Sequence, residues 1–242
     1  MRRNSFSNHA LLHSRTVLKI KSVEFAGAIG QPGQPPPESA RGMPQVAFSG
    51  RSNVGKSSLI NRLLGRTRTA IARVSATPGK TQEINFYRVR ADLGDFFVVD
   101  LPGYGFARAP EEVRKKWEKF IHAYLSRGED LVGVVQLVDL RTGATPDDLR
   151  SVDYLAELGL PVLFAFTKAD KLTATKRKEA FDKTVRELQI EPDQAIAFSA
   201  LKGDGREDLL ETLGALLFPG GEEAPEAGEG GGTEADVAGE PD

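Results

Sequence analysis

The sequence predicts an α/β fold in which a mostly parallel sheet of six to seven strands carries helices on both faces. Two observations lead to this fold class. From residue 45 onward, short apolar runs alternate with longer stretches of helical periodicity. Most of these runs are apolar throughout, which is typical of parallel strands that helices cover on both sides. The chain has 242 residues, of which 40% are hydrophobic, so it can bury one sizeable core.

The elements follow in chain order. Residues 16–25 alternate apolar and polar side chains, which predicts a half-buried strand. Residues 30–44 contain five prolines and are predicted to form a linker outside the core, because proline lacks a backbone donor. Residues 83–89 alternate again and are interpreted as an edge strand antiparallel to residues 96–100. Further strands are predicted at 46–48, 131–138, 162–166 and 195–198, and helices at 56–65, 111–127, 146–158, 174–189 and 205–217.

The two ends of the chain differ in charge. Residues 218–242 contain eight Asp and Glu residues and no Lys or Arg, so this segment is predicted to be a disordered acidic tail. Removing these eight negative charges from the overall net charge of −2 leaves +6 for residues 1–217, which makes the body mildly basic. Residues 1–15 are expected to be a flexible basic N-terminus, and residues 16–217 the folded domain.

Composition excludes several classes of protein. The chain has no cysteine, which rules out a disulfide framework, a thiolate metal site and a cysteine nucleophile. No apolar run approaches the roughly 18 residues of a membrane helix, and the N-terminal apolar stretch is too short for secretion. We therefore expect a cytoplasmic protein with no membrane span. The basic, serine-containing N-terminus is also typical of an organellar transit peptide, and that alternative stays open.

A glycine-rich pattern, GxxxxGK[ST], follows the strand at 46–48 and begins the helix at 56. This context is that of a phosphate-binding loop, whose backbone N–H groups and helix N-terminus face phosphate oxygens. We expect Lys56 to reach the outer phosphates and the Ser57 hydroxyl to bind Mg2+. The loop comprises Gly50, Arg51, Ser52, Asn53, Val54, Gly55, Lys56 and Ser57.

A second motif ends the strand at 96–99, and ligands in this architecture bind beyond the carboxyl ends of strands. We expect the Asp100 carboxylate to hold the hydration shell of Mg2+. The Gly103 N–H is expected to contact a terminal phosphate and to move when that phosphate leaves. The motif comprises Asp100, Leu101, Pro102 and Gly103.

A third motif ends the strand at 162–166 and predicts a base-recognition site. A carboxylate accepts two hydrogen bonds from the N1–H and 2-amino group of guanine, which adenine does not offer, so Asp170 is expected to select guanine. The Lys168 stem is expected to lie over the base. At the end of the last strand, a backbone N–H is expected to meet the guanine carbonyl oxygen. The residues concerned are Thr167, Lys168, Ala169 and Asp170, together with Phe198, Ser199 and Ala200.

The ordered stretches GRSNVGKS, TPGKTQ, DLPGYGFA, TKAD and FSA resemble the EngB (YihA/YsxC) family of bacterial GTPases over roughly residues 15–217. The resemblance implies a Ras-like P-loop GTPase fold that binds GTP and GDP with Mg2+. It also implies a role in large ribosomal subunit assembly and in normal division septation. By the same resemblance the first switch is formed by Gly79, Lys80, Thr81, Gln82 and Glu83, with the Thr81 hydroxyl as the second protein ligand of Mg2+ beside Ser57. Lys56, Thr81 and Gly103 are then the residues expected to act in catalysis.

Three positions depart from a generic GTPase. Tyr104 stands where many Ras-like proteins place a water-orienting glutamine, so we expect slow intrinsic hydrolysis that a partner or an ion accelerates. Asn53 lies where potassium-activated GTPases carry an asparagine, which makes K+ a possible cofactor; capping of the loop is the alternative. Thr167 replaces the commoner asparagine. Tyr104 and Phe106 are expected in a mobile loop. Burial in the core poorly explains two aromatic side chains there, so we expect them to signal the bound nucleotide to a partner.

Basic residues flank both nucleotide-sensing segments, which favours a phosphate-rich partner such as RNA. By the resemblance this partner is the large ribosomal subunit, with its rRNA and ribosomal proteins. We expect no DNA partner and a monomer. A solvated charged face is the alternative. The residues are Arg62, Arg66, Arg68, Arg73 and Lys80 in one cluster, and Arg108, Arg114, Lys115, Lys116 and Lys119 in the other.

Two competing functions stay open. A metabolic phosphotransferase with the same phosphate loop would need a second substrate pocket and no guanine site. A GTP-regulated scaffold acting directly at the division septum would have no ribosome role. A helical stripe of Trp117, Phe120 and Tyr124 is interpreted as core packing rather than as part of a site.

Overall fold

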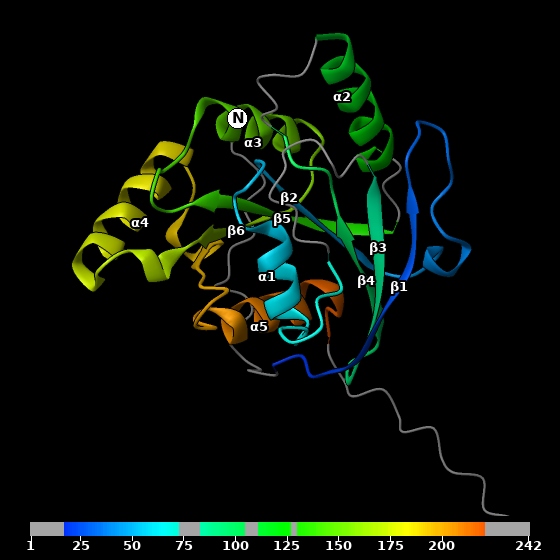
Figure 1. The fold of residues 1–242 in the computed structure, drawn as a ribbon, viewed down its shortest axis with the longest axis horizontal. Helices are drawn as coiled ribbons and strands as arrows, with labels where there is room; N and C mark the ends of the chain where they lie inside the picture. The colour runs from blue at the N-terminus through cyan, green and yellow to red at the C-terminus, as the bar shows by residue number, and fades with distance from the viewer. Residues whose placement is uncertain (1–16, 73–82, 105–110, 127–129, 221–242) are drawn as a thin grey trace, which may run out of the picture.

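The computed structural model describes residues 17–72, 83–104, 111–126 and 130–220 (Figure 1). Within these residues one sheet contains seven strands: β1 (Ile20–Ile29), β2 (Gln45–Gly50), β3 (Ile84–Ala91), β4 (Asp95–Asp100), β5 (Leu131–Asp139), β6 (Val162–Thr167) and β7 (Ala195–Ala197). Their order is β1-β3-β4-β2-β5-β6-β7. The strands from β4 to β7 in this order pair in parallel, whereas β3 is antiparallel to both β1 and β4. The predicted fold class is therefore confirmed.

The helices lie close to the predicted ranges. Each predicted α-helix begins and ends within two residues of the observed one. Among the helices that the structure describes, none combines the length and the apolar composition needed to cross a bilayer. The α-helices are α1 (Lys56–Leu63), α2 (Glu111–Leu125), α3 (Pro146–Glu157), α4 (Ala174–Leu188) and α5 (Arg206–Leu217), and short 3-10 helices are η2 (Glu38–Ala40), η3 (Ala169–Lys171) and η4 (Pro192–Gln194).

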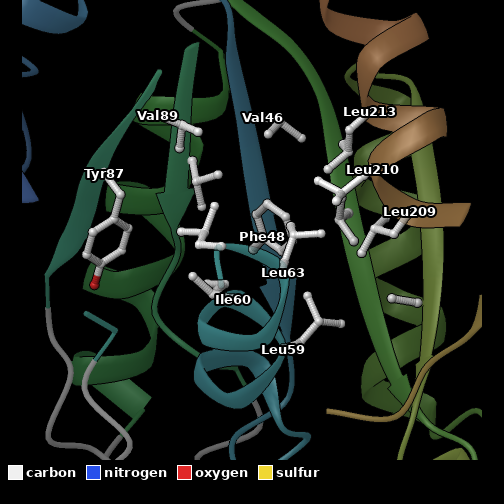
Figure 2. Close-up of a cluster of buried hydrophobic side chains, with 14 of the residues drawn as sticks. Val46, Phe48, Leu59, Ile60, Leu63, Tyr87, Val89, Leu209, Leu210 and Leu213 are labelled. Carbon is white, nitrogen blue, oxygen red and sulfur yellow. The ribbon is translucent and has the colours of Figure 1, made fainter. Parts of the chain in front are cut away.

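Helices cover both faces of the sheet, as the apolar strands predict (Figure 1). Successive side chains of a strand point to opposite faces. In β2, Val46 and Phe48 pack with leucines of α1 and α5, whereas Ala47 packs with residues of α2 and α3. Figure 2 shows α1 lying against the sheet, with Leu59, Ile60 and Leu63 in the same cluster as the leucines of α5. A third cluster joins α3 and α4 to β6.

The strand order places β2 at the point where the chain changes direction across the sheet. After β2 and α1 the chain adds β3 and β4 on one side, and it then crosses to add β5 on the other side. Such a switch point opens a crevice at the carboxyl end of the strand, where ligands bind in sheets of this kind. The loop after β2 is the glycine-rich segment 50–57.

The edge of the sheet differs from the sequence prediction. We expected residues 83–89 to form an edge strand, but β1 pairs along the outer side of β3 and is itself the edge. β1 also continues to Ile29, beyond the expected end at residue 25. A register shift between Phe25 and Gly27 allows this continuation, because the extra residue restores the pairing of Ala28 and Ile29 with β3.

The proline-rich segment 30–44 contributes to the core, contrary to the prediction. Ala40 is fully buried in the cluster that contains Ile29, and its carbonyl accepts a hydrogen bond of 2.9 Å from the side chain of Gln45. Pro37 lies so close to Gly27 that a Cβ on this glycine would be 3.1 Å from the proline ring. The segment therefore packs back onto the end of β1.

The folded domain extends beyond the predicted end at residue 217. Phe218 packs against the cluster of α1 and α5, and its ring lies edge-on to Phe96 at a centroid distance of 6.3 Å. Gly94 leaves room for this ring, because a Cβ there would lie 2.8 Å from it. Phe218 is therefore a core residue and not the first residue of the tail.

The aromatic stripe of α2 is buried where the structure describes it. Phe120 and Tyr124 are 6% and 5% exposed, and the Tyr124 hydroxyl donates to Gln45 at 2.9 Å. The side chain of Trp117 lies outside the described part. Core packing is confirmed for Phe120 and Tyr124.

Candidate functional site

Three of the predicted motifs meet at one edge of the sheet. The loops after β2, β4 and β6 all leave the carboxyl ends of parallel strands of the same sheet. In the pairing register Phe48 lies beside Asp100, and Asp139 lies beside Thr167. Residues that are far apart in sequence therefore lie at the same edge of the sheet.

The phosphate loop has the backbone that anion binding requires. Asn53 and Gly55 adopt left-handed conformations, with φ angles of 63° and 107°. Gly50 admits no side chain, because a Cβ would lie 2.9 Å from Val54 and 3.0 Å from Leu137. Gly55 caps α1 without any side-chain hydrogen bond, and the first turn of α1 contains no acidic residue. The N–H groups of the first turn of α1 and the positive end of the helix dipole thus face the position where phosphate oxygens would bind.

The loop after β4 contacts the phosphate loop directly. The Ser52 N–H donates to the Tyr104 carbonyl at 2.9 Å, and the Tyr104 N–H donates to the Gly50 carbonyl at 3.2 Å. A Cβ on Gly103 would lie 3.1 Å from the Ser52 nitrogen, so this close approach depends on glycine. Leu101 and Pro102 are buried and hold the loop in place.

Lys56 and Asp100 form an ion pair at the centre of the site. The ammonium group of Lys56 donates to Asp100 Oδ1, and the two side chains are only 10% and 4% exposed. The Asp100 carboxylate and the Ser57 hydroxyl at the start of α1 supply the hard oxygen donors that Mg2+ prefers. These residues therefore fit a metal-bound nucleotide phosphate.

The base-recognition residues line a cavity of about 480 Å³ beside α1. Its wall includes Thr167, Lys168, Asp170, Phe198 and Ala200. The Ala169 side chain is buried behind this wall. The predicted grouping of these two segments, 167–170 and 198–200, is thus present in the structure.

The Asp170 carboxylate is oriented by its neighbours. Its side chain is 6% exposed, and Ser199 Oγ donates to Oδ1 at 2.9 Å. Burial acts to raise the pKa of Asp170, but the hydrogen bond from Ser199, together with Lys171, outweighs it and lowers the pKa below the ordinary value. Asp170 therefore stays ionised and can accept two hydrogen bonds. The Ser199 N–H donates to the Asp204 carbonyl at 3.0 Å, so this donor is already engaged within the chain.

Thr167 and Lys168 tie the base site to the phosphate loop. The Thr167 hydroxyl donates to the Val54 carbonyl at 2.7 Å, which gives this departure from the commoner asparagine a structural role. Lys168 Nζ donates to the Asn53 carbonyl at 2.7 Å. Because both side chains bind backbone atoms of the phosphate loop, the two halves of the site hold each other in position.

Asp139 is a site residue that the sequence reasoning missed. It ends β5, accepts hydrogen bonds from Lys168 at 2.8 Å and from Arg141 at 2.7 Å, and is 5% exposed. Its burial acts to raise its pKa, but the hydrogen bonds from Arg141 and Lys168 lower the pKa to about 2. A polar residue at the carboxyl end of an apolar strand was the signal that could have found it.

We expected burial to explain Tyr104 poorly, but its side chain is packed and hydrogen-bonded. Its hydroxyl donates to Asp148 Oδ1 at 2.8 Å and accepts from the side chain of Gln136. Burial, and then the neighbouring Asp148 carboxylate, raise the pKa of Tyr104 above its usual range. Tyr104 is therefore a neutral tyrosine held by β5 and α3. Phe106 lies outside the described residues.

The first switch falls largely outside the described residues, as do several basic positions. Glu83 is described and exposed at the start of β3. In the basic clusters, Arg68 and Lys119 are exposed, whereas Arg62 and Arg66 donate to backbone carbonyls of the same chain. Gly79, Lys80, Thr81, Gln82, Arg73 and Arg108, and the side chains of Arg114, Lys115 and Lys116, are the predicted residues not described.

The fold and the three loops together define a P-loop GTPase. A family profile described as a 50S ribosome-binding GTPase matches residues 45–168. A probable GTP-binding protein EngB from Geobacter metallireducens is 42% identical over 88% of this chain and 100% of its own length. The EngB protein of Gemmatimonas aurantiaca is 41% identical over 82% of this chain and 94% of its own. The chain belongs to the EngB family of GTP-binding proteins and is a GTPase.

Solved structures agree with this family and fold. The crystal structure of a probable GTP-binding protein EngB superposes with a TM-score of 0.57 and 26% identity, over 72% of this chain and 98% of that chain. Era from Aquifex aeolicus bound to GDP and AlF4− gives a TM-score of 0.60 at 24% identity, over 74% of this chain and 57% of Era. The likeness to Era is one of fold.

Proposed function

We propose that the chain is a cytoplasmic, monomeric GTP-dependent switch protein that assists assembly of the large ribosomal subunit and is thereby needed for normal cell division and septation. The observation that carries the proposal is that the phosphate loop contacts both the Asp100–Gly103 loop and the Thr167–Asp170 loop at one edge of the sheet. The first two sense phosphates and the third selects guanine.

The Lys56–Asp100 ion pair supports a two-state site. A bound nucleotide would present phosphate oxygens to Lys56 and bring a hydrated Mg2+ to Asp100. Lys56 would then exchange the Asp100 carboxylate for phosphate oxygens, and Asp100 would exchange the Lys56 ammonium group for the hydrated Mg2+. Ser57 and Thr81 would hold the Mg2+, which supplies positive charge to the phosphates when bound. Gly103 packs on Ser52, so it can pass a movement of the terminal phosphate to the following loop.

Hydrolysis is proposed to be slow. Lys56, Thr81 and Gly103 stabilise charge on the phosphates, but the hydroxyl of Tyr104 is already engaged by Asp148 and Gln136. No water-orienting glutamine follows Gly103. Acceleration then requires a partner or a monovalent ion that supplies the missing positioning and charge.

The partner is proposed to be the large ribosomal subunit. The family description, 50S ribosome-binding GTPase, supports this choice. Exposed basic residues such as Arg68 and Lys119 supply charge that rRNA phosphates would neutralise, although Arg62 and Arg66 have internal partners. Affinity for the subunit should therefore fall steeply as salt rises.

The test is co-sedimentation of the full chain with purified large subunits, in GDP and in a non-hydrolysable GTP analogue, at low and at moderate salt. We expect binding that depends on the nucleotide and falls at least about tenfold between the two salt concentrations. Asp170→Asn is the matched control, because it should transfer nucleotide preference to xanthine and let xanthine nucleotides control binding. Equal binding in all nucleotides, or none, would favour a scaffold at the septum without a ribosome role.

A further inference from the structure

A single arginine joins the phosphate-binding helix to the loop beside the base. Arg62 lies in the last turn of α1, the helix that begins with Lys56. Its Nε donates to the Ala200 carbonyl at 2.6 Å, and its Nη2 donates to the Leu201 carbonyl at 2.6 Å. Hydrogen bonds from a charged guanidinium to two consecutive carbonyls fix the orientation of both peptide groups.

These carbonyls are linked to Asp170 by a short relay. In a trans peptide the N–H points away from the C=O, so the N–H of Lys202 faces away from Arg62 when the Leu201 carbonyl faces it. This N–H donates to Ser199 Oγ at 3.0 Å. The Ser199 hydroxyl then has its one hydrogen directed to Asp170 Oδ1, at 2.9 Å.

A second arginine, Arg206, joins α5 to the end of α1, and its side chain bonds the backbone of α1 rather than the 199–202 loop. Arg206 begins α5, and its Nε donates to the carbonyls of Arg62 and Leu63 at 3.0 and 3.1 Å. Arg206 therefore supplies a hydrogen-bond donor to carbonyls at the C-terminal end of α1, which lack partners within the helix. The Arg206 side chain donates to carbonyls of α1, whereas the Arg62 side chain donates to carbonyls of the 199–202 loop. Replacing the Arg206 side chain therefore tests the packing of α1 on α5 without removing the hydrogen bonds that Arg62 makes to the loop.

We propose that Arg62 is a positioning residue for guanine recognition, which holds the 199–202 loop so that Ser199 orients Asp170 and the Ala200 N–H faces the base. The inference rests on the proposed guanine site and adds a specificity determinant outside the nucleotide-binding motifs. The Arg62 side chain lines the same cavity as Asp170 and Ala200. Because its Nε and Nη2 are engaged by the carbonyls of Ala200 and Leu201, it acts on the base through this loop.

The test compares GDP with inosine diphosphate, which lacks only the 2-amino group. In GDP this group would donate a hydrogen bond to Asp170. Calorimetry on the full chain with Arg62→Met should show GDP binding weakened about tenfold and inosine diphosphate binding weakened less. The preference for GDP should then fall about threefold or more. Arg206→Met is the matched control, and we expect it to lower the unfolding temperature while leaving the preference within about twofold of the wild type.

Two further variants keep the test decisive. Arg62→Lys keeps the positive charge but loses the planar fork that fixes two carbonyls at once, so we expect it to give an intermediate preference. It serves as the test if Arg62→Met does not fold. In a Ser199→Ala background, Arg62→Met should reduce the preference no further, because the relay is already broken.

An unchanged preference in Arg62→Met, or an equal loss in Arg206→Met, would overturn the inference while leaving the guanine site intact. A wild-type chain without preference for GDP would instead overturn the proposed function, and the inference with it.

Discussion

Removal of the Tyr104 hydroxyl, which bonds two buried polar side chains, should lower the stability of the fold. Replacing Tyr104 by Phe removes one oxygen that donates to Asp148 and accepts from Gln136, and it changes little else in side-chain shape. Asp148 is 2% exposed and Gln136 is fully buried, so water does not readily replace the lost partner. The variant should leave a buried carboxylate and a buried amide each short of one hydrogen bond.

The size of the loss follows from these contacts. A hydrogen bond to a charged group contributes about 1.5–3 kcal/mol, and a buried group left without its partner costs about 1–3 kcal/mol. The two effects overlap, and Asp148 keeps its hydrogen bonds from Thr145. We expect the free energy of unfolding of Tyr104→Phe to fall by about 2–3 kcal/mol, which corresponds to a decrease in Tm of roughly 5–10 °C for a domain of this size.

Urea unfolding at neutral pH measures this loss, with an unchanged slope showing that stability alone has changed. Tyr154→Phe is the matched control on α3, because it removes a hydroxyl whose contact with His122 is exposed. The control should lose less than about 1 kcal/mol. A loss below about 0.5 kcal/mol in Tyr104→Phe, or equal losses in both variants, would show that the Asp148 contact does not hold this loop.

Three other predictions concern pH, ions and rate. The pKa of Asp139 is about 2 in the folded chain, against about 3.9 in the unfolded chain. The unfolded state therefore binds more protons as pH falls from about 5 to 2, and the free energy of unfolding should fall by about 2 kcal/mol over that window. Asp139→Asn should flatten this part of the plot of unfolding free energy against pH. GTP turnover should be faster in K+ than in Na+, and Asn53→Ala should remove the difference; equal rates in the wild type would leave Asn53 a loop residue only. Single-turnover hydrolysis by the isolated chain in Na+ should be on the order of 10⁻³ s⁻¹ or slower, and a rate near 1 s⁻¹ would contradict the role given to Tyr104.

The parts of the site that could be predicted are those where residue type and spacing meet a backbone requirement. The phosphate loop needs glycine at Gly50 and a left-handed residue at Gly55, and the structure has both features. Asp170 was predicted because an ionised carboxylate after an apolar strand suits guanine. Asp139 had the same signal but no familiar motif around it.

Arg62 could not have been found from the sequence. Its partners are backbone carbonyls of Ala200 and Leu201, which lie more than 130 positions away and which any residue type would supply. The sequence placed it in a basic cluster instead. Tyr104 was misjudged for a related reason, because Asp148, its partner, comes from a helix 44 residues later.

The fold was predicted well where apolar runs are long and less well at the ends. Ala40 is buried within a proline-rich segment, and Phe218 is partly buried next to an acidic, glycine-rich segment. Average composition hides both residues. The outer edge of the sheet was misplaced because pairing of β1 with β3 joins residues about 60 positions apart. Local periodicity carries no information about which strand lies beside which.

Selection of guanine by one ionised carboxylate beside a phosphate loop is the feature on which the proposed function depends. Calorimetric titration of the full chain with GDP and with ADP, in Mg2+, tests it most directly. We expect GDP to bind at least about a hundredfold more tightly than ADP, because adenine leaves the Asp170 carboxylate without its two donors. Equal affinity for the two nucleotides, or no binding of either, would contradict it.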